Sequence, residues 1–117
     1  MNHFHFPSAN ALPTISFYER YFGFRKIRLL GNTHILINQN KFLLAIDEST
    51  ASDPLPATSH LGFQLPDKEE VRKIHEQMRT DFPSDTGHLL EPSARALHYY
   101  CSDPSGNRLE IGWYELS

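Results

Sequence analysis

Two short stretches, His3-Phe-His-Phe6 and His60-Leu-Gly-Phe63, lie 57 residues apart and carry the pattern that decides the fold. In both stretches apolar residues alternate with others, as in a β-strand that packs one face against a core. The same shift places Phe17 on Ile74, and both residues lie in segments with helical spacing of apolar residues. The sequence therefore predicts an internal repeat in which a strand is followed by a helix.

Local signals define the two predicted helices. In the first half, Pro13 suits a first helical position and Gly23 suits the residue after the last turn. In the second half, Asp67 suits an N-cap, with Glu70 three residues later completing a capping box.

The predicted strands occupy residues 2–7, 24–30, 33–38 and 41–46 in the first half, and 60–65, about 87–91, 96–102 and 108–114 in the second.

A segment rich in Pro, Ser, Thr and Ala separates the two halves. It covers residues 49–58 and reads as a linker between a first module of about residues 1–48 and a second of about 59–117. The predicted order, βαβββ followed by βαβββ, belongs to the α+β class. At 117 residues the whole chain has the size of a single domain.

Composition and charge exclude several classes of function. The formal net charge is only −3 and the charges are interspersed, so nucleic acid is a poor candidate partner. No apolar run approaches the roughly 20 residues of a membrane span. The N-terminus has neither a basic region nor a continuous apolar run, so we expect no secretory signal. We therefore expect a cytoplasmic protein with no membrane partner.

The single cysteine, Cys101, cannot form an intramolecular disulfide, which fits a reducing compartment. We expect a buried, inert thiol at this position. Any metal site must then be built from histidine and carboxylate. Of the seven histidines, His34 and His75 are predicted to be solvated.

One carboxylate occupies an unusual place. Glu110 lies in the middle of a predicted strand, and its neighbours Leu109 and Ile111 point the other way. A carboxylate inside a strand is disfavoured unless it is exposed or paired. If a pseudo-twofold axis brings the two His-bearing strands to one cleft, His3, His60 and Glu110 could form a two-histidine, one-carboxylate metal site. Strand histidines and glutamates are more often solvated or hydrogen-bonded, so both interpretations stay open.

Four motifs resemble the vicinal oxygen chelate superfamily, which includes glyoxalase I, fosfomycin-resistance proteins, extradiol dioxygenases and bleomycin-resistance proteins. They are His3-Phe-His-Phe, Ser16-Phe17-Tyr18 with Gly23-Phe24, His60-Leu-Gly-Phe, and the most specific, Asp103-Pro104-Ser-Gly106-Asn107-Arg-Leu-Glu110. The resemblance covers essentially the whole chain. It implies two βαβββ modules that form a cleft-shaped, barrel-like mixed sheet, commonly assembled as a homodimer.

The resemblance also implies a metal site and a class of activity. His3, His60 and Glu110 would hold one divalent ion, with Mn, Fe, Ni or Zn all admissible. Glyoxalase I has a fourth ligand where this chain has Ala45, so open positions would remain for a substrate. The implied protein is a lyase, isomerase or dioxygenase-like metalloenzyme whose small oxygenated substrate is chelated through vicinal oxygens. The alternative is a non-catalytic protein that binds small molecules, of the bleomycin-resistance type.

Three further residues are candidates for the site. His5 shares a strand face with His3 and could act as a base, contact the substrate or be structural. The resemblance places Tyr100 where fosfomycin-resistance proteins carry a substrate-contacting tyrosine, and His98 shares its face. The predicted catalytic residues are thus Glu110, His5 and Tyr100, and the predicted substrate contacts are His5, His98 and Tyr100.

Overall fold

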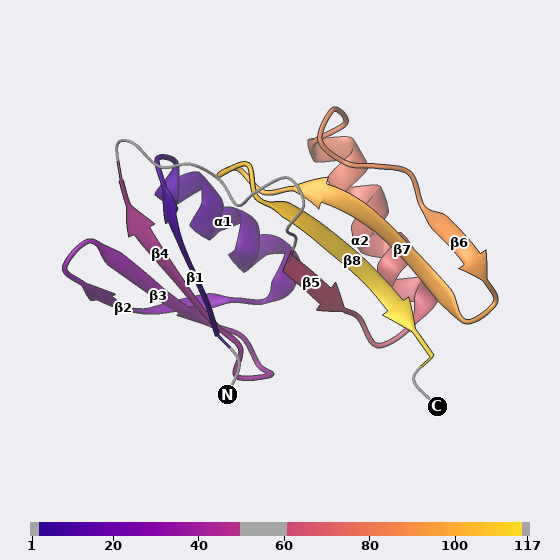
Figure 1. Ribbon diagram of the computed structural model, residues 1–117, viewed down its shortest axis with the longest axis horizontal. Coiled ribbons are helices and arrows are strands. Elements are labelled where there is room, and N and C mark those ends of the chain that lie inside the picture. Colours follow the sequence, from indigo (N-terminus) through magenta and orange to yellow (C-terminus); the bar gives the residue numbers. More distant parts are fainter. Residues whose placement is uncertain (1–2, 50–60, 116–117) are drawn as a thin grey trace. The chain divides into compact units, whose positions relative to one another are not determined.

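The computed structural model describes residues 3–49 and 61–115 (Figure 1). The chain divides into two compact units, one comprising residues 1–55 and 103–106 and the other residues 56–102 and 107–117. Each unit contains one four-stranded sheet and one helix. The α+β class and the two βαβββ modules are therefore confirmed. Among the described residues, strands pair only within their own module, so the two sheets do not close into one barrel.

The first unit contains β1 (His3–Ser8), α1 (Ala11–Phe22), β2 (Arg25–Leu30), β3 (Thr33–Ile37) and β4 (Leu43–Glu48). The strand order is β1-β4-β3-β2, with β1 parallel to β4 and the other pairs antiparallel. Gly23 ends α1 as predicted, with φ of 67° and its N–H bonded to the carbonyl of Tyr18. The prediction for Pro13 was wrong, because the helix begins at Ala11. A proline is tolerated there because N–H groups of the first turn have no acceptor within the helix.

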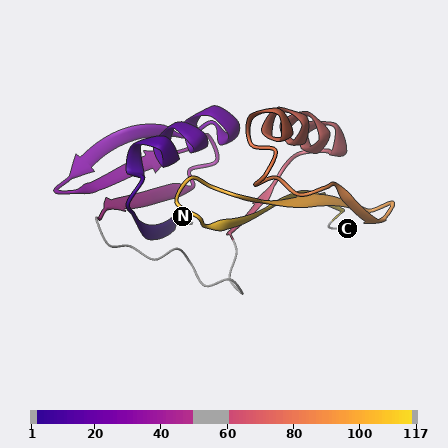
Figure 2. The same cartoon turned by 90° about the horizontal axis from the view of Figure 1, so that it is seen from above.

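Aromatic residues dominate the core of this unit. Figure 2 shows that α1 lies on one face of its sheet. The buried residues between them come from both elements: Phe6, Ile15, Phe17, Tyr18, Phe22, Phe24, Leu36, Leu44 and Ile46. Along each of β1, β3 and β4, these buried residues alternate with residues whose side chains lie on the opposite face of the sheet. We call the side of each sheet that faces away from its own helix the distal face.

His34 corrects a prediction. Its side chain is only 4% exposed and its Nε2 lies 2.8 Å from Oε1 of Glu48, so it is not solvated. The alternation of β3 places His34 on the same side as the buried Leu36, beneath α1. A buried histidine needs a polar partner, and Glu48 on the neighbouring β4 provides one.

The second unit contains β5 (Leu61–Gln64), α2 (Lys68–Asp81), β6 (Leu90–Ser93), β7 (Ala96–Ser102) and β8 (Arg108–Tyr114), in the order β5-β8-β7-β6. Asp67 caps α2 as predicted, since its carboxylate accepts a hydrogen bond from the N–H of Glu70 at 2.8 Å. The strand expected at about 87–91 begins later, at Leu90. Gly87 donates its N–H to the carbonyl of Tyr100 before that strand starts.

The core of the second unit lies between α2 and its sheet. Val71 and Met78 of α2 are fully buried, together with Leu97, Tyr99, Leu109 and Ile111 of the strands. Cys101 is also buried, as expected. His75, predicted to be solvated, is instead half-buried, with Nε2 2.8 Å from the carbonyl oxygen of Gly87.

The turn after β7 belongs to the first unit. Asp103 is buried and accepts a 2.7 Å hydrogen bond from the hydroxyl of Tyr18 in α1. Ser105 lies 2.5 Å from the hydroxyl of Ser8 and 2.6 Å from that of Thr14. The most specific motif in the sequence therefore begins with residues that bind the turn to β1 and α1.

Within the described residues, no helix has the length and apolar character that a membrane crossing requires.

Candidate functional site

The distal face of the first sheet carries His3 and His5. Both are exposed, and they alternate with Phe4 and Phe6 on the helix side, as the sequence predicted. The register of the parallel pair β1–β4 places His5 beside Ala45. Ala45 carries only a methyl group, which cannot coordinate a metal ion.

A carboxylate orients the imidazole of His5. Its Nε2 lies 2.8 Å from Oδ2 of Asp47, and the other carboxylate oxygen accepts a hydrogen bond from the hydroxyl of Thr33. The hydrogen bond from Thr33, and after it the one from His5, holds the pKa of Asp47 below its ordinary value. The sequence analysis missed Asp47, although it follows Ala45 by two positions on the same strand face.

Glu110 lies on the distal face of the second sheet, between Gly62 on β5 and Tyr100 on β7. The hydroxyl of Tyr114 donates a hydrogen bond to its Oε2 at 2.6 Å. Tyr100 also forms a side-chain hydrogen bond with Glu110. The mid-strand carboxylate is therefore paired, as its position required, and its partners are two tyrosines.

The two tyrosines are donors at neutral pH. Burial, followed by the hydrogen bond to Glu110, raises the pKa of Tyr114 well above its ordinary value. The hydrogen bond to Glu110, followed by burial, raises the pKa of Tyr100. Both phenols stay protonated, and the carboxylate of Glu110 is the acceptor between them.

His98 belongs to the same aromatic group. Its ring stacks on that of Tyr114 with centroids 5.8 Å apart, and it meets Tyr100 edge-on at 5.6 Å. Gly112 lies opposite it on β8, and a Cβ there would come within 2.7 Å of the Cβ of His98. Gly112 therefore allows His98 to lie close over the strand. The Nδ1 atom of His98 is buried and has no hydrogen-bond partner in the described part of the chain.

A hollow of about 250 Å³ lies beside Glu110. It is lined by Gly62, Phe63, Gln64, Glu110 and Tyr114. A Cβ added at Gly62 would meet no atom within 4 Å, so the position next to the carboxylate is empty space. Glu110 thus combines a fixed carboxylate with room for a ligand on one side.

The predicted metal site is not assembled from described residues alone. Over residues 3–49 and 61–115, no group of three His, Cys, Asp or Glu side chains could hold a metal ion. His60 lies outside the described residues, and His3 and Glu110 belong to different units. The assignment of His3, His60 and Glu110 as ligands therefore stays a prediction. Glu110 itself fits a carboxylate ligand, because its neighbour Gly62 leaves space where a cation could approach.

The sequence profile of the Glyoxalase/Bleomycin resistance protein/Dioxygenase superfamily matches residues 1–111. The chain belongs to this superfamily. The resemblance carried by the four sequence motifs is therefore confirmed. No curated protein sequence matches the chain significantly.

Solved structures share the fold. A possible glyoxalase from Bacillus cereus is 24% identical over 95% of this chain and 96% of its own, with a TM-score of 0.78. A variant of the fosfomycin resistance protein FosX from Listeria monocytogenes, complexed with Mn(II) and dihydroxypropylphosphonic acid, is 18% identical over 99% and 90%, with a TM-score of 0.80. A bleomycin resistance determinant encoded on transposon Tn5 is 21% identical over 99% and 98%, with a TM-score of 0.70.

Proposed function

We propose that this protein is a metal-dependent enzyme of the glyoxalase/dioxygenase type that acts on a small oxygenated substrate chelated through vicinal oxygens. His3, His60 and Glu110 would hold one divalent ion, Mn, Fe, Ni or Zn. The observation that carries the proposal is the setting of Glu110, a carboxylate fixed by two tyrosines beside a hollow that Gly62 keeps empty. The fosfomycin resistance protein crystallised with Mn(II) supports a divalent ion in this fold.

The remaining residues of the two distal faces suit substrate handling. The bound ion would act as a Lewis acid toward a substrate oxygen. Asp47 orients His5, whose remaining ring nitrogen could contact the substrate or exchange a proton with it. Tyr100 and His98 supply aromatic surface on the face of Glu110, where a substrate could pack. Ala45 leaves a coordination position that a substrate could fill.

Metal content tests the proposal. Glu110→Gln keeps the size of the side chain and removes the only anionic ligand, so the purified variant should retain less than about a tenth of the wild-type metal. Glu115→Gln is the matched control, because it makes the same change at an exposed carboxylate that pairs with Arg95. Equal metal content in wild type and Glu110→Gln would refute the assignment.

One observation favours the alternative function. Glu110 already accepts hydrogen bonds from two tyrosines, so its half-buried carboxylate has partners without a metal. A non-catalytic protein of the bleomycin-resistance type, which binds and sequesters small molecules, would not need a metal ion at Glu110. Ligand binding that is unchanged by EDTA treatment would support the alternative, whereas a chelating ligand bound only by metal-loaded protein would support the enzyme.

We also propose that the protein is a cytoplasmic homodimer. β2 is an edge strand whose six residues are all exposed, including Ile27, Leu29 and Leu30. Apolar side chains on an unpaired edge favour association with a second copy. Sedimentation should show a dimer at micromolar concentration, and Leu29→Lys should shift it toward monomer. A wild-type protein that sediments only as monomer would exclude the dimer.

A further inference from the structure

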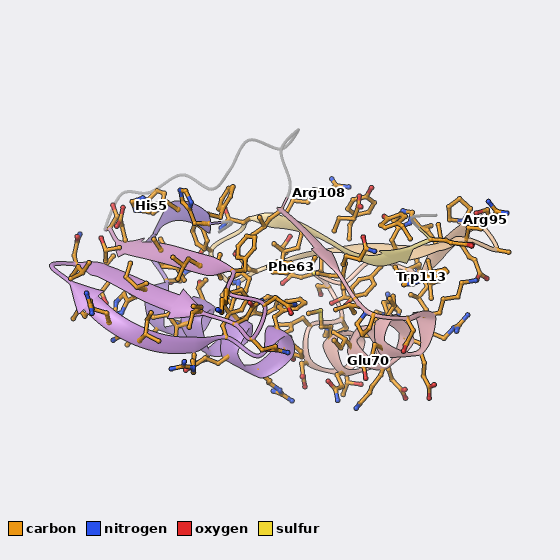
Figure 3. All side chains as sticks on the ribbon, turned by 90° about the horizontal axis from the view of Figure 1, so that it is seen from below. His5, Phe63, Glu70, Arg95, Arg108 and Trp113 are labelled. Carbon is orange, nitrogen blue, oxygen red and sulfur yellow. The ribbon has the colours of Figure 1, made fainter. Side chains whose placement is uncertain are left out.

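Arg108 stands next to the candidate site and has no assigned role. It is the first residue of β8 and lies two positions before Glu110, so the two side chains emerge on the same distal face. Figure 3 shows Arg108 on the side of the second sheet away from α2, whereas Trp113 lies on the side toward α2. Along a strand two residues span about 7 Å, which places Arg108 within the reach of a small molecule held at Glu110.

The guanidinium of Arg108 is held in place by an aromatic ring. Its central carbon lies 4.5 Å from the centroid of the Tyr100 ring. At this distance the cation is attracted to the face of the ring, an interaction that uses none of the guanidinium's N–H groups as hydrogen-bond donors. Because the hydroxyl of the same tyrosine bonds Glu110, Tyr100 positions both the cation and the carboxylate.

Three other cations of this unit differ from Arg108, because each pairs with a carboxylate. Lys68 and Arg72 pair with Glu91, and Arg95 pairs with Glu115. No carboxylate in the described ranges 3–49 and 61–115 forms an ion pair with Arg108. An arginine held against an aromatic ring, and with no carboxylate partner among these residues, suits the bidentate binding of an oxyanion.

We propose that Arg108 is an anion-recognition residue, and that the substrate carries a negatively charged oxyanion group, a carboxylate or a phosphonate, in addition to its chelating oxygens. The inference rests on the proposed metal-dependent function and names the substrate class of that same site. Tyr100 is the positioning residue that holds the guanidinium over the distal face beside Glu110. Neutral chelators would engage only the metal, whereas anionic chelators would gain a second contact.

Matched ligands test the inference with Mn(II)-loaded protein. Homoprotocatechuate is a catechol with a carboxymethyl group, and its primary amide has nearly the same shape without the charge. Calorimetry should show that wild type binds the acid about tenfold or more tightly than the amide, because only the acid gains a charge-assisted contact with the guanidinium. The corresponding phosphonate distinguishes the two oxyanions: tighter binding than the carboxylate indicates a phosphonate-type substrate, and weaker binding indicates a carboxylate.

Three variants separate the possible results. Arg108→Gln should bind the acid and the amide equally, with amide affinity and Mn(II) content as in wild type. Arg108→Lys should retain part of the preference, because it keeps the charge and loses the planar fork. Arg95→Gln is the control for a surface cation and should keep the full preference.

Failure of the role proposed for Arg108 can be distinguished from failure of the proposed metal-dependent function. Equal binding of acid and amide by wild type, or a preference that survives in Arg108→Gln, overturns the role of Arg108 and leaves the metal site intact. A wild-type protein that binds no Mn(II), or binds neither catechol, overturns the proposed function and this inference together. Loss of Mn(II) from both Arg108 variants would show a structural role and would also overturn it.

Discussion

Replacing Tyr18 by Phe isolates one buried hydrogen bond. The side chain of Tyr18 is fully buried and its hydroxyl donates to Oδ2 of Asp103, which is itself 4% exposed. Phenylalanine keeps the ring and its packing against Phe6 and Phe24 and removes only the donor. A hydrogen bond to a buried carboxylate contributes about 1.5–3 kcal/mol to stability. We expect the free energy of unfolding to fall by about 2 kcal/mol, which lowers the melting temperature by roughly 5–10 °C for a chain of this size.

Tyr99→Phe is the matched control. Tyr99 is equally buried in the second unit, but its hydroxyl bonds the sulfur of Met78 at 3.3 Å, a weak acceptor. Its loss should cost less than about 1 kcal/mol. Urea unfolding of Tyr18→Phe, Asp103→Asn and the double variant should give a coupling energy of about 1 kcal/mol or more, and none between Asp103 and Tyr99. Equal losses for both tyrosines, or no coupling to Asp103, would refute the assignment of this bond as a stabilising contact of the turn.

Three further changes probe the distal faces. Gly112→Ala places a Cβ within 2.7 Å of the Cβ of His98, so the free energy of unfolding in urea should fall by about 1–3 kcal/mol. An unchanged urea midpoint would contradict the close contact. Tyr114→Phe removes the donor to a proposed metal ligand and should weaken Mn(II) binding about tenfold by calorimetry, and equal affinity would exclude a positioning role. Thr33→Val removes the largest cause of the lowered pKa of Asp47. A lowered pKa stabilises the fold above the ordinary value of 3.8 and this stabilisation disappears in acid, so the stability difference from wild type should narrow as the pH falls from about 5 to 2. A constant difference would show that the hydroxyl acts only through packing.

The repeat of strand, helix and three strands could be predicted because each element has its own local signal. Alternation located the strands, Gly23 located the end of the first helix, and Asp67 located the start of the second. The start of the first helix was predicted two residues too late, because proline is compatible with any position of the first turn and Pro13 does not mark the first one. The strand expected at about 87–91 was displaced because Gly87 and Thr86 already pair with β7 outside a regular strand.

The candidate site was predicted less completely. The mid-strand position of Glu110 indicated that its carboxylate needs a partner, but its tyrosine partners were not predicted from the sequence. The strand period of two places Tyr114 on the same face as Glu110 and could have identified one of them. The same period places His34 beside Leu36 on the helix side, which predicts burial. Its partner Glu48 is distant in sequence, and only the pairing of β3 with β4 brings the two together. Contacts that depend on strand register are not visible in local sequence.

The register of the two parallel strand pairs gives the repeat a chemical meaning. In the first unit His5 lies beside Ala45, and at the corresponding place in the second unit Gly62 lies beside Glu110. Each pair thus combines one polar side chain with one residue too small to obstruct it. In the first unit the polar member comes from the first strand, and in the second it comes from the last strand. Equivalent places in the two repeats therefore present different groups, the imidazole of His5 in one and the carboxylate of Glu110 in the other, so similar halves can have different roles.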